Sequence, residues 1–131
     1  YRNAVIGGIM CGAAFGKGIG GLVVDGAVRD VEELRSHGWP VFAAAVVPCA
    51  VDSEGPGQLN HPISCGGVPV HPGDIILADD NGVTVIPPAW VDWVLEGCEK
   101  RRQSEARRTA EIGQGQLTSA AVRAKLDKLG L

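Results

Sequence analysis

The chain has 131 residues, a length that predicts a single domain able to bury a hydrophobic core. Its 12 basic and 15 acidic residues give a formal net charge of −3, without the basic surplus that is typical of nucleic-acid-binding proteins. The longest apolar run, Val41 to Val51, contains Pro48 and is too short to span a membrane. The sequence therefore predicts a cytoplasmic protein with no nucleic-acid partner and no membrane partner.

The four cysteines are separated by long intervals, without the Cys-x-x-Cys spacing of a zinc site. A disulfide scaffold would need cysteines at a higher density in a shorter, secreted chain. The sequence therefore predicts free thiols at Cys11, Cys49, Cys65 and Cys98 in a reducing compartment.

The first predicted element is a helix that begins directly at Tyr1. Gly7 and Gly8 are unusual in an apolar helical pattern, because a glycine costs roughly 1 kcal/mol against alanine there. Two explanations stay open. One is tight packing of the helix, and the other is a helix that begins near Gly8 and offers the amides of Ile9 and Met10 to an anion.

The segment Gly16–Gly21 satisfies the pattern G-x-G-x-x-G. A dinucleotide-binding fingerprint follows a strand and opens a helix, whereas this segment closes a helix and precedes a strand. We therefore interpret it as a helix stop. Leu22–Val24 is the predicted strand, and Asp25-Gly26 is a predicted turn.

Arg29 and Asp30 come directly after this predicted turn. A guanidinium group can bind a carboxylate or an enolate oxygen through two parallel hydrogen bonds. The neighbouring carboxylate can hold a divalent cation through oxygen. The pair therefore offers both halves of a site for a 2-oxo acid, while the alternative is a solvated surface ion pair.

The rest of the chain alternates short strands with helices. A helix over Val31–His37, capped by Asp30 and ended by Gly38, precedes a fully buried strand over Val41–Val47. Further predicted elements are a polar loop at Asp52–Gly57, short strands around Ile63, Val68–Val70, Ile75–Leu77 and Val83–Ile86, a hairpin turn at Asp80–Gly82, and helices over Pro88–Ile112 and Thr118–Leu129.

The long helix changes character along its length. Its first half carries an apolar stripe, whereas the segment Glu99–Glu111 is mostly charged, and its only apolar residues are Ala106 and Ala110. A helix that is polar on every side either stands in solvent or reaches another subunit. Both readings stay open from the pattern alone.

The spacing of the charged residues carries a family resemblance. Gly8 is followed by twenty residues, then by Arg29-Asp30, and after two further residues by Glu33. This pattern resembles the RraA-like family of class II, metal-dependent pyruvate aldolases, which includes 4-hydroxy-4-methyl-2-oxoglutarate and 4-carboxy-4-hydroxy-2-oxoadipate aldolases. The likeness continues through further blocks, namely Leu34–Pro40, Val41–Ala43, Ser64–Val68, Pro72–Asp74 and Ala78–Val83 to Pro87.

The resemblance implies a fold and an assembly. The expected fold is an α/β layered domain of the swivelling β/β/α type, RraA-like, over residues 1–112, with a C-terminal helical extension over residues 113–131. Relatives carry a substantial N-terminal region, so the chain is expected to be the C-terminal part of a longer subunit, with a strand beside Leu22–Val24 missing. Subunits are expected to form a homotrimer or a homohexamer.

The resemblance also implies an activity, which is metal-dependent cleavage of a 4-hydroxy-2-oxo acid to pyruvate and a second 2-oxo acid, with oxaloacetate decarboxylation as a side activity. Arg29 and the stretch Gly7, Gly8, Ile9 and Met10 are expected to bind the small-molecule substrate. Asp30 is expected to hold Mg²⁺ or Mn²⁺, together with Glu105 donated by a neighbouring subunit. Many bacterial members carry an acidic residue where this chain has Gly8, so the catalytic base is expected to be Glu33 or a water molecule.

Two other functional readings stay open. Some members of the family are non-catalytic regulators that bind an RNA-degrading endonuclease and lack the Arg-Asp pair. The presence of Asp30 argues against that role here, because a protein-binding surface needs no metal ligand. A catalytically idle oligomer is the third reading, because of Gly8 and the expected missing N-terminal region.

Overall fold

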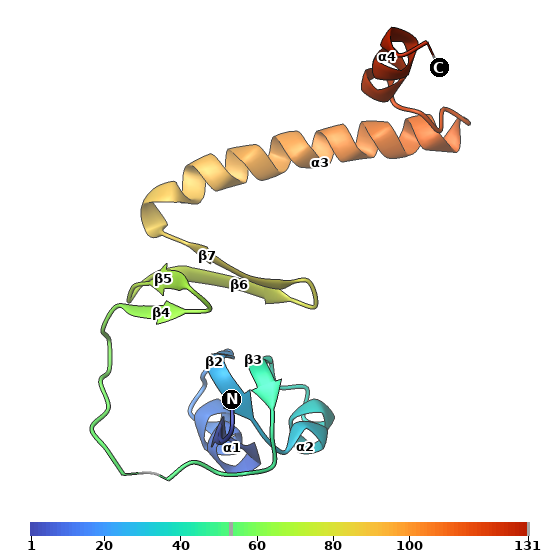
Figure 1. Cartoon of the computed structure of the whole chain (residues 1–131). Helices are drawn as coiled ribbons and strands as arrows, with labels where there is room; N and C mark the ends of the chain where they lie inside the picture. The colour runs from blue at the N-terminus through green and yellow to red at the C-terminus, as the bar shows by residue number, and fades with distance from the viewer. Residues whose placement is uncertain (53, 131) are drawn as a thin grey trace. The chain divides into compact units, whose positions relative to one another are not determined.

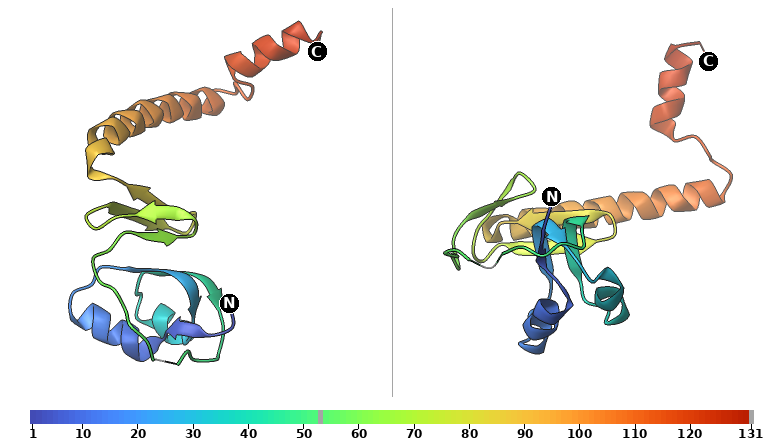
Figure 2. Two further views of the ribbon diagram at one scale, coloured as in Figure 1. Left: turned by 60° about the vertical axis from the view of Figure 1, so that its left-hand side comes forward. Right: turned by 60° about the horizontal axis from the view of Figure 1, so that its bottom comes forward.

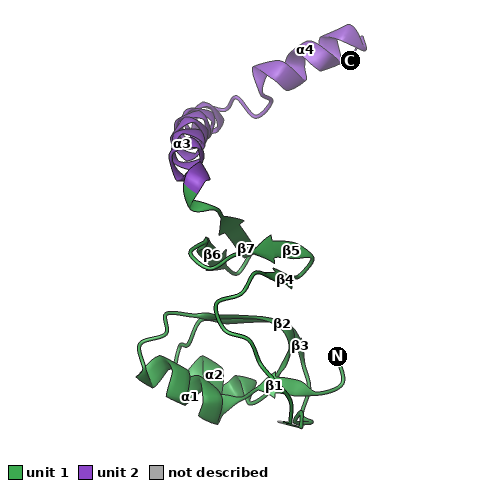
Figure 3. Cartoon of the chain, turned by 90° about the vertical axis from the view of Figure 1, so that its left-hand side faces the viewer, with its two compact units in different colours: residues 1–88 green, residues 89–131 purple. Residues whose placement is uncertain are grey.

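The computed structural model describes residues 1–52 and 54–130. Ser53, in the predicted loop Asp52–Gly57, lies outside the described residues. The chain divides into two compact units, residues 1–88 and residues 89–131, which are coloured separately in Figure 3.

The first unit alternates strands and helices before it ends in two hairpins. Its elements in chain order are β1 (Ala4–Ile6), α1 (Gly8–Gly16), β2 (Leu22–Val28), α2 (Val31–Ser36), β3 (Val41–Val46), β4 (Ile63–Cys65), β5 (Val68–Val70), β6 (Ile75–Asp79) and β7 (Gly82–Ile86) (Figure 1).

Strands β1, β2 and β3 form a parallel sheet in the order β1-β2-β3. Helix α1 connects β1 to β2, and helix α2 connects β2 to β3, so both connections are βαβ crossovers. Sequential crossovers of the usual right hand place both helices on one face of the sheet, as Figures 1 and 3 show. The buried apolar side chains of the described residues belong to this layer: Ala4, Cys11, Ala27, Val28 and Leu34.

The N-terminal prediction was wrong in its first element. Residues 4–6 form strand β1, and the helix begins only at Gly8. A strand of three residues is too short to show an alternating pattern. Its apolar residues were therefore assigned to the helix that follows. The glycine pair therefore lies at a junction between a strand and a helix.

The predicted turn at Asp25-Gly26 was also wrong, because β2 continues through it to Val28. The pairing register with β3 shifts between Val24 and Ala27, so these two residues form an irregularity inside the strand. The Asp25 carboxylate accepts hydrogen bonds from the Gly66 amide (2.9 Å) and the Tyr1 hydroxyl (3.1 Å). These bonds satisfy a polar side chain in mid-strand.

Helix α1 ends at Gly16, and Gly18 follows with a positive φ of 83°. The Gly18 amide donates to the Phe15 carbonyl (2.9 Å), which is the hydrogen bonding expected where a helix stops. The interpretation of the glycine-rich segment as a helix stop is confirmed.

The hairpins agree with the sequence. Strands β4 and β5 pair antiparallel, as do β6 and β7, and Asp79 lies opposite Gly82 across the turn. The Asn81 amide donates to the Asp79 carboxylate (2.8 Å), which closes this turn. A fully buried strand was predicted over Val41–Val47, but β3 spans Val41–Val46 and its Val46 is 64% exposed. Strand β3 is an edge of its sheet, and with β2 and the hairpins it borders a cavity of about 1030 Å³.

The second unit consists of a short 3-10 turn (Pro88–Trp90), α3 (Val91–Gly113) and α4 (Ala120–Lys128), with α3 and α4 joined by a short connection (Figure 2). The predicted helices are confirmed, and Ser119 caps α4 by accepting from the Val122 amide. Ion pairs such as Lys100–Glu96 (2.6 Å) run along α3. No helix of the described residues is long and apolar enough to cross a membrane.

Candidate functional site

The topology of the parallel sheet brings two segments of the predicted site together. Gly7 follows β1, and Arg29 follows β2. Ile6 and Val28 are register partners at the carboxyl ends of these strands, and the Arg29 amide donates to the Ile6 carbonyl (3.1 Å). In open α/β sheets, ligands bind at the carboxyl ends of the strands. The predicted site residues therefore lie where this fold places a ligand.

Asp30 occupies an unusual backbone conformation. Its φ of 60° and ψ of 37° lie in the left-handed region, which aspartate tolerates better than most residues but which still costs about 1–3 kcal/mol. Asp30 was predicted to cap α2. It directly precedes that helix, but its side chain makes no capping hydrogen bond, so this prediction was wrong. Its Oδ2 atom instead accepts from the Gly8 amide (3.0 Å) and lies 3.5 Å from Arg29 Nε. The strained backbone thus turns the carboxylate towards α1.

Glu33 lies in the first turn of α2 and completes a group of three charged side chains. Its carboxylate fills the space beside Gly8, since a β-carbon on Gly8 would overlap Oε2 and lie 2.9 Å from Oε1. We refer to Arg29, Asp30 and Glu33 as the charged cluster. The side chains of Arg29 and Asp30 are 41% and 43% exposed, so the cluster is open to a ligand.

The first turn of α1 supplies amides beside this cluster. The Cys11 amide donates to the Gly7 carbonyl (3.0 Å) and so makes the first bond of the helix. Helical geometry consequently leaves the amides of Ile9 and Met10 without an acceptor inside the helix. These are the two amides that the anion-binding reading requires, because the positive end of the helix dipole lies here. The Ile9 and Met10 side chains are 89% and 58% exposed.

Cys11 is a neighbour of the site that the sequence did not indicate. The residue is 0% exposed, one helical turn after Gly8. Burial raises the pKa of the Cys11 thiol, and the negative charges of Glu33 and Asp30 raise it further. The thiol therefore stays protonated at neutral pH, so it is not a nucleophile. The helical spacing from Gly8 was the only signal that could have placed it here.

The donors of the cluster suit a hard divalent cation. Asp30 and Glu33 provide carboxylate oxygens, and Mg²⁺ is usually held by one or two carboxylates while it keeps several of its waters. Among the residues that the structure describes, no group of three or more histidines, cysteines or acidic residues could hold a metal ion. A site within this unit would therefore use the carboxylates of Asp30 and Glu33 together with water.

Glu105 lies in the second unit, on α3, and its side chain is 70% exposed. Its carboxylate is 3.6 Å from Arg101 Nε, and both residues border a hollow of about 430 Å³ along the helix. The structure thus brings together Asp30, Glu33, Arg29 and the glycine pair, while Glu105 belongs to a separate group of residues.

The cavity of about 1030 Å³ in the first unit lies elsewhere. Its lining comes from β2, β3 and the two hairpins, is mainly apolar, and includes none of the charged cluster. An apolar wall does not compensate the charge of a 2-oxo acid, whereas the guanidinium and the helix amides do. The charged cluster is therefore the candidate active site.

Comparisons with known proteins show the family to which the chain belongs. The family model for RraA-like proteins, described as Aldolase/RraA, matches residues 1–85. The chain is 39% identical over 97% of its length to a "Putative 4-hydroxy-4-methyl-2-oxoglutarate aldolase" from Halalkalibacterium halodurans, of which it covers 59%.

Two solved structures share the fold. One is an uncharacterized protein from Pseudomonas syringae pv. tomato, with a TM-score of 0.78 and 26% identity over 86% of this chain and 57% of that chain. The other is the RNA-processing inhibitor RraA from Thermus thermophilus, with a TM-score of 0.61 and 42% identity over 66% of this chain and 52% of that chain. The predicted α/β, RraA-like fold is confirmed, and the chain spans a little over half the length of these proteins.

Proposed function

Because the chain belongs to the Aldolase/RraA family, we propose that the protein cleaves a 4-hydroxy-2-oxo acid to pyruvate and a second 2-oxo acid. One observation carries this proposal. A guanidinium, two carboxylates and the free amides of a helix N-terminus converge at the carboxyl ends of two neighbouring parallel strands. These groups suit a substrate that carries a carboxylate, a carbonyl and a hydroxyl.

Arg29 binds the substrate in this proposal. Its guanidinium is half-exposed beside the first turn of α1, where the amides of Ile9 and Met10 are also free to donate. Together these donors bind the carboxylate of the pyruvyl part and the negative charge that develops on its carbonyl oxygen. Cleavage of the C3–C4 bond leaves C3 as the enolate of pyruvate, so stabilising that charge lowers the barrier.

Asp30 and Glu33 are the residues that would hold Mg²⁺ or Mn²⁺. When bound, a divalent cation supplies positive charge that stabilises negative charge on substrate oxygens. The Gly8 amide and Arg29 hold Oδ2 of Asp30 in place, and among the described residues no group occupies Oδ1, which can therefore be a ligand. The lysine of a Schiff-base mechanism is not required, and the only lysine before Lys100 is Lys17.

Glu33 is also the side chain best placed to handle protons. Retro-aldol cleavage removes the proton of the 4-hydroxyl and later returns a proton to C3. The Glu33 carboxylate lies beside Gly8 at the start of α1, and in this proposal it reaches a bound substrate directly or through a water molecule. Oxaloacetate decarboxylation follows from the same stabilisation, because carbon dioxide then replaces the departing carbonyl compound.

We further propose that the site is completed between subunits. Two carboxylates leave most positions around a cation to water, and the exposed Glu105 on α3 offers a third carboxylate. Donation of Glu105 by a neighbouring subunit requires a homo-oligomer, for which a trimer or a hexamer is the proposed form.

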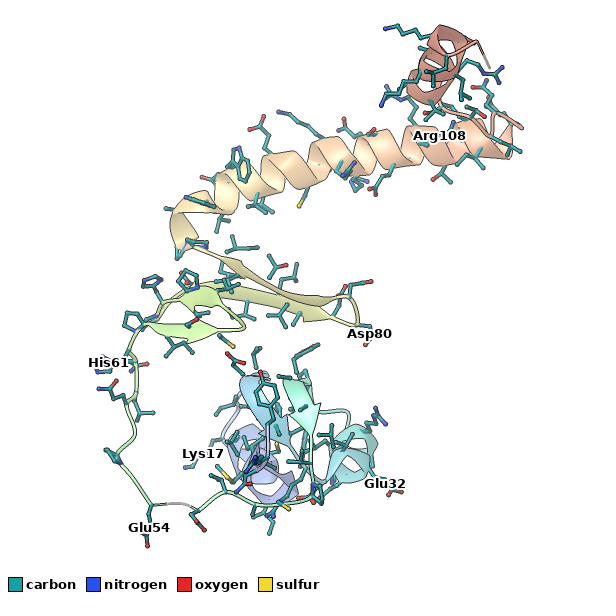
Figure 4. The ribbon with its side chains drawn as sticks, viewed as in Figure 1. Lys17, Glu32, Glu54, His61, Asp80 and Arg108 are labelled. Carbon is teal, nitrogen blue, oxygen red and sulfur yellow. The ribbon has the colours of Figure 1, made fainter. Side chains whose placement is uncertain are left out.

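Metal binding by Asp30 tests the proposal. In the full-length protein, Asp30→Ala should abolish Mg²⁺-stimulated pyruvate release and weaken Mn²⁺ binding in a calorimetric titration. Glu32→Ala is the matched control, because Glu32 is an exposed acidic residue in the same first turn of α2 and points outward (Figure 4). Full Mg²⁺-stimulated activity in Asp30→Ala would show that the metal assignment is wrong.

The alternative function is that of a regulator that binds an RNA-degrading endonuclease. The likeness to a protein named an RNA-processing inhibitor favours it. The two functions are separated by assaying RNA cleavage by a bacterial ribonuclease of the RNase E type with and without the protein. Inhibition that survives Arg29→Ala, together with no pyruvate release by the wild type, would support the regulator.

A further inference from the structure

We propose that Gly7 and Gly8 are positioning residues, because the space of their missing side chains is the slot that holds the charged cluster over the first turn of α1. The inference rests on the proposed function, since the slot matters only if the cluster binds metal and substrate. It assigns the glycine pair a steric role, which differs from donating amides to an anion.

Gly8 is not required by its backbone conformation. It is the first residue of α1, and its φ is not positive. The structure gives a steric reason for glycine, because a β-carbon here would overlap the Glu33 carboxylate. Gly8 itself is buried, so its backbone cannot move away without disturbing the packing of α1.

The same steric reason applies at Gly7, where the neighbouring charged groups are those of Arg29 and Asp30. Its φ of −146° and ψ of −173° are extended angles that any residue adopts. A β-carbon on Gly7 would lie 2.5 Å from Asp30 Oδ2 and 2.9 Å from Arg29 Nε. Both distances are shorter than van der Waals contact, so a side chain at position 7 would displace these groups.

The charged side chains cannot move aside without loss. Oδ2 of Asp30 would give up its hydrogen bond from the Gly8 amide, which also satisfies a donor at the start of α1. Glu33 could leave by changing its rotamer, but its carboxylate would then leave the space beside Gly8, whose amide holds Oδ2 of Asp30. The expected result of Gly8→Ala is therefore a folded protein whose second carboxylate has been displaced.

The test compares metal binding and kinetics across a set of variants of the full-length protein. Mn²⁺ affinity is measured by titration calorimetry for Gly8→Ala, for Glu33→Ala and for the double variant, with a thermal melt for each. Gly16→Ala is the matched control, because Gly16 ends the same helix and a β-carbon there would meet nothing within 4 Å. Asp30→Ala serves as the reference for loss of the metal site.

We expect Gly8→Ala to weaken Mn²⁺ binding about 10- to 100-fold, the loss typical when a metal ligand loses its orientation. The double variant should bind Mn²⁺ no more weakly than Glu33→Ala alone, because the overlap no longer exists when Glu33 is shortened. Gly16→Ala should bind as the wild type does. In turnover, Gly8→Ala should lower kcat more than it changes KM, since Arg29 remains in place.

Wild-type Mn²⁺ affinity in Gly8→Ala would overturn the proposal. It would also be overturned if the double variant lost as much Mn²⁺ affinity as the two single variants lose together. Gly8→Ala could fail to fold. In that case a folded double variant with the Mn²⁺ affinity of Glu33→Ala still supports the slot. A double variant that also fails to fold overturns it. A wild type that binds no Mn²⁺, or an Asp30→Ala variant that binds it fully, would instead contradict the proposed function.

Discussion

At the scale of single residues, the site depends on a few short distances. Oδ2 of Asp30 lies 3.0 Å from the Gly8 amide and 3.5 Å from Arg29 Nε, and Glu33 fills the space beside Gly8. The residue types and their spacing were predictable from the sequence. The direction of the Asp30 carboxylate was not, because it depends on a left-handed backbone that only the join between β2 and α2 imposes.

Arg29 provides the sharpest prediction at this scale. Arg29→Lys keeps the positive charge but loses the planar fork, so it should raise KM and lower kcat together. Arg29→Ala should cost several kcal/mol of transition-state stabilisation, on the order of the loss of an oxyanion donor. Steady-state kinetics of pyruvate release measures both.

A simple surface ion pair makes the opposite prediction. In that case both Arg29 variants keep near-normal kinetics, and a thermal melt shows a stability change of at most about 1 kcal/mol. Unchanged kinetics in Arg29→Ala would therefore contradict the aldolase proposal.

At the scale of elements, segments with turn residues or helical periodicity were predictable, and so were the three-residue strands β4 and β5, whereas β1 and the full length of β2 were not. The β6–β7 hairpin and the helices α3 and α4 carry clear signals in turn residues and periodicity, and the structure confirms them. The three residues of β1 have no such signal and were taken for helix. The extension of β2 through Asp25-Gly26 was missed because an irregular pairing register replaces the turn that the dipeptide favours.

The β6–β7 turn gives a prediction about protonation. Hydrogen bonds from Asn81, with its backbone amide as the largest cause, hold the pKa of Asp79 below its ordinary value of 3.8. Because the folded pKa is lowered, the stabilisation is present above the unfolded pKa and is lost as the pH falls through the folded value. NMR titration of the Asp79 carboxyl should therefore show a pKa below 3.8.

The variant Asn81→Ala separates the two hydrogen bonds of this turn. It removes the side-chain donor, which is 3.2 Å from Asp79 Oδ2, and keeps the backbone donor at 2.8 Å from Oδ1. The pKa of Asp79 should rise only in part. A complete return to 3.8 would show that the backbone bond is not the main cause.

At the scale of the whole molecule, the first unit holds the charged cluster, and α3 in the second unit holds the exposed Glu105. The sequence predicted both groups of residues, but a family resemblance alone supplied the idea that two subunits share a site. Contacts between subunits leave no periodic signal in one chain, so the assembly stays a prediction.

Mixing two inactive variants tests whether the site is shared. If Glu105 acts on the cluster of a neighbouring subunit, co-refolded Asp30→Ala and Glu105→Ala subunits should regain a fraction of wild-type activity, because some sites then receive an intact residue from each chain. Glu96→Ala, which breaks the exposed pair with Lys100 on the same helix, is the control and should remain active alone. If Glu105→Ala alone is fully active, the proposed donation is wrong.

Pyruvate release tests the central claim most directly. The full-length protein, freed of metal with a chelator, is supplied with 4-hydroxy-4-methyl-2-oxoglutarate or with oxaloacetate, with and without Mg²⁺. The account predicts pyruvate from both substrates when Mg²⁺ is present and little or none without it, because the charged cluster has two carboxylates to hold the cation and one guanidinium to bind the 2-oxo acid. No pyruvate from either substrate in the presence of Mg²⁺ would contradict it.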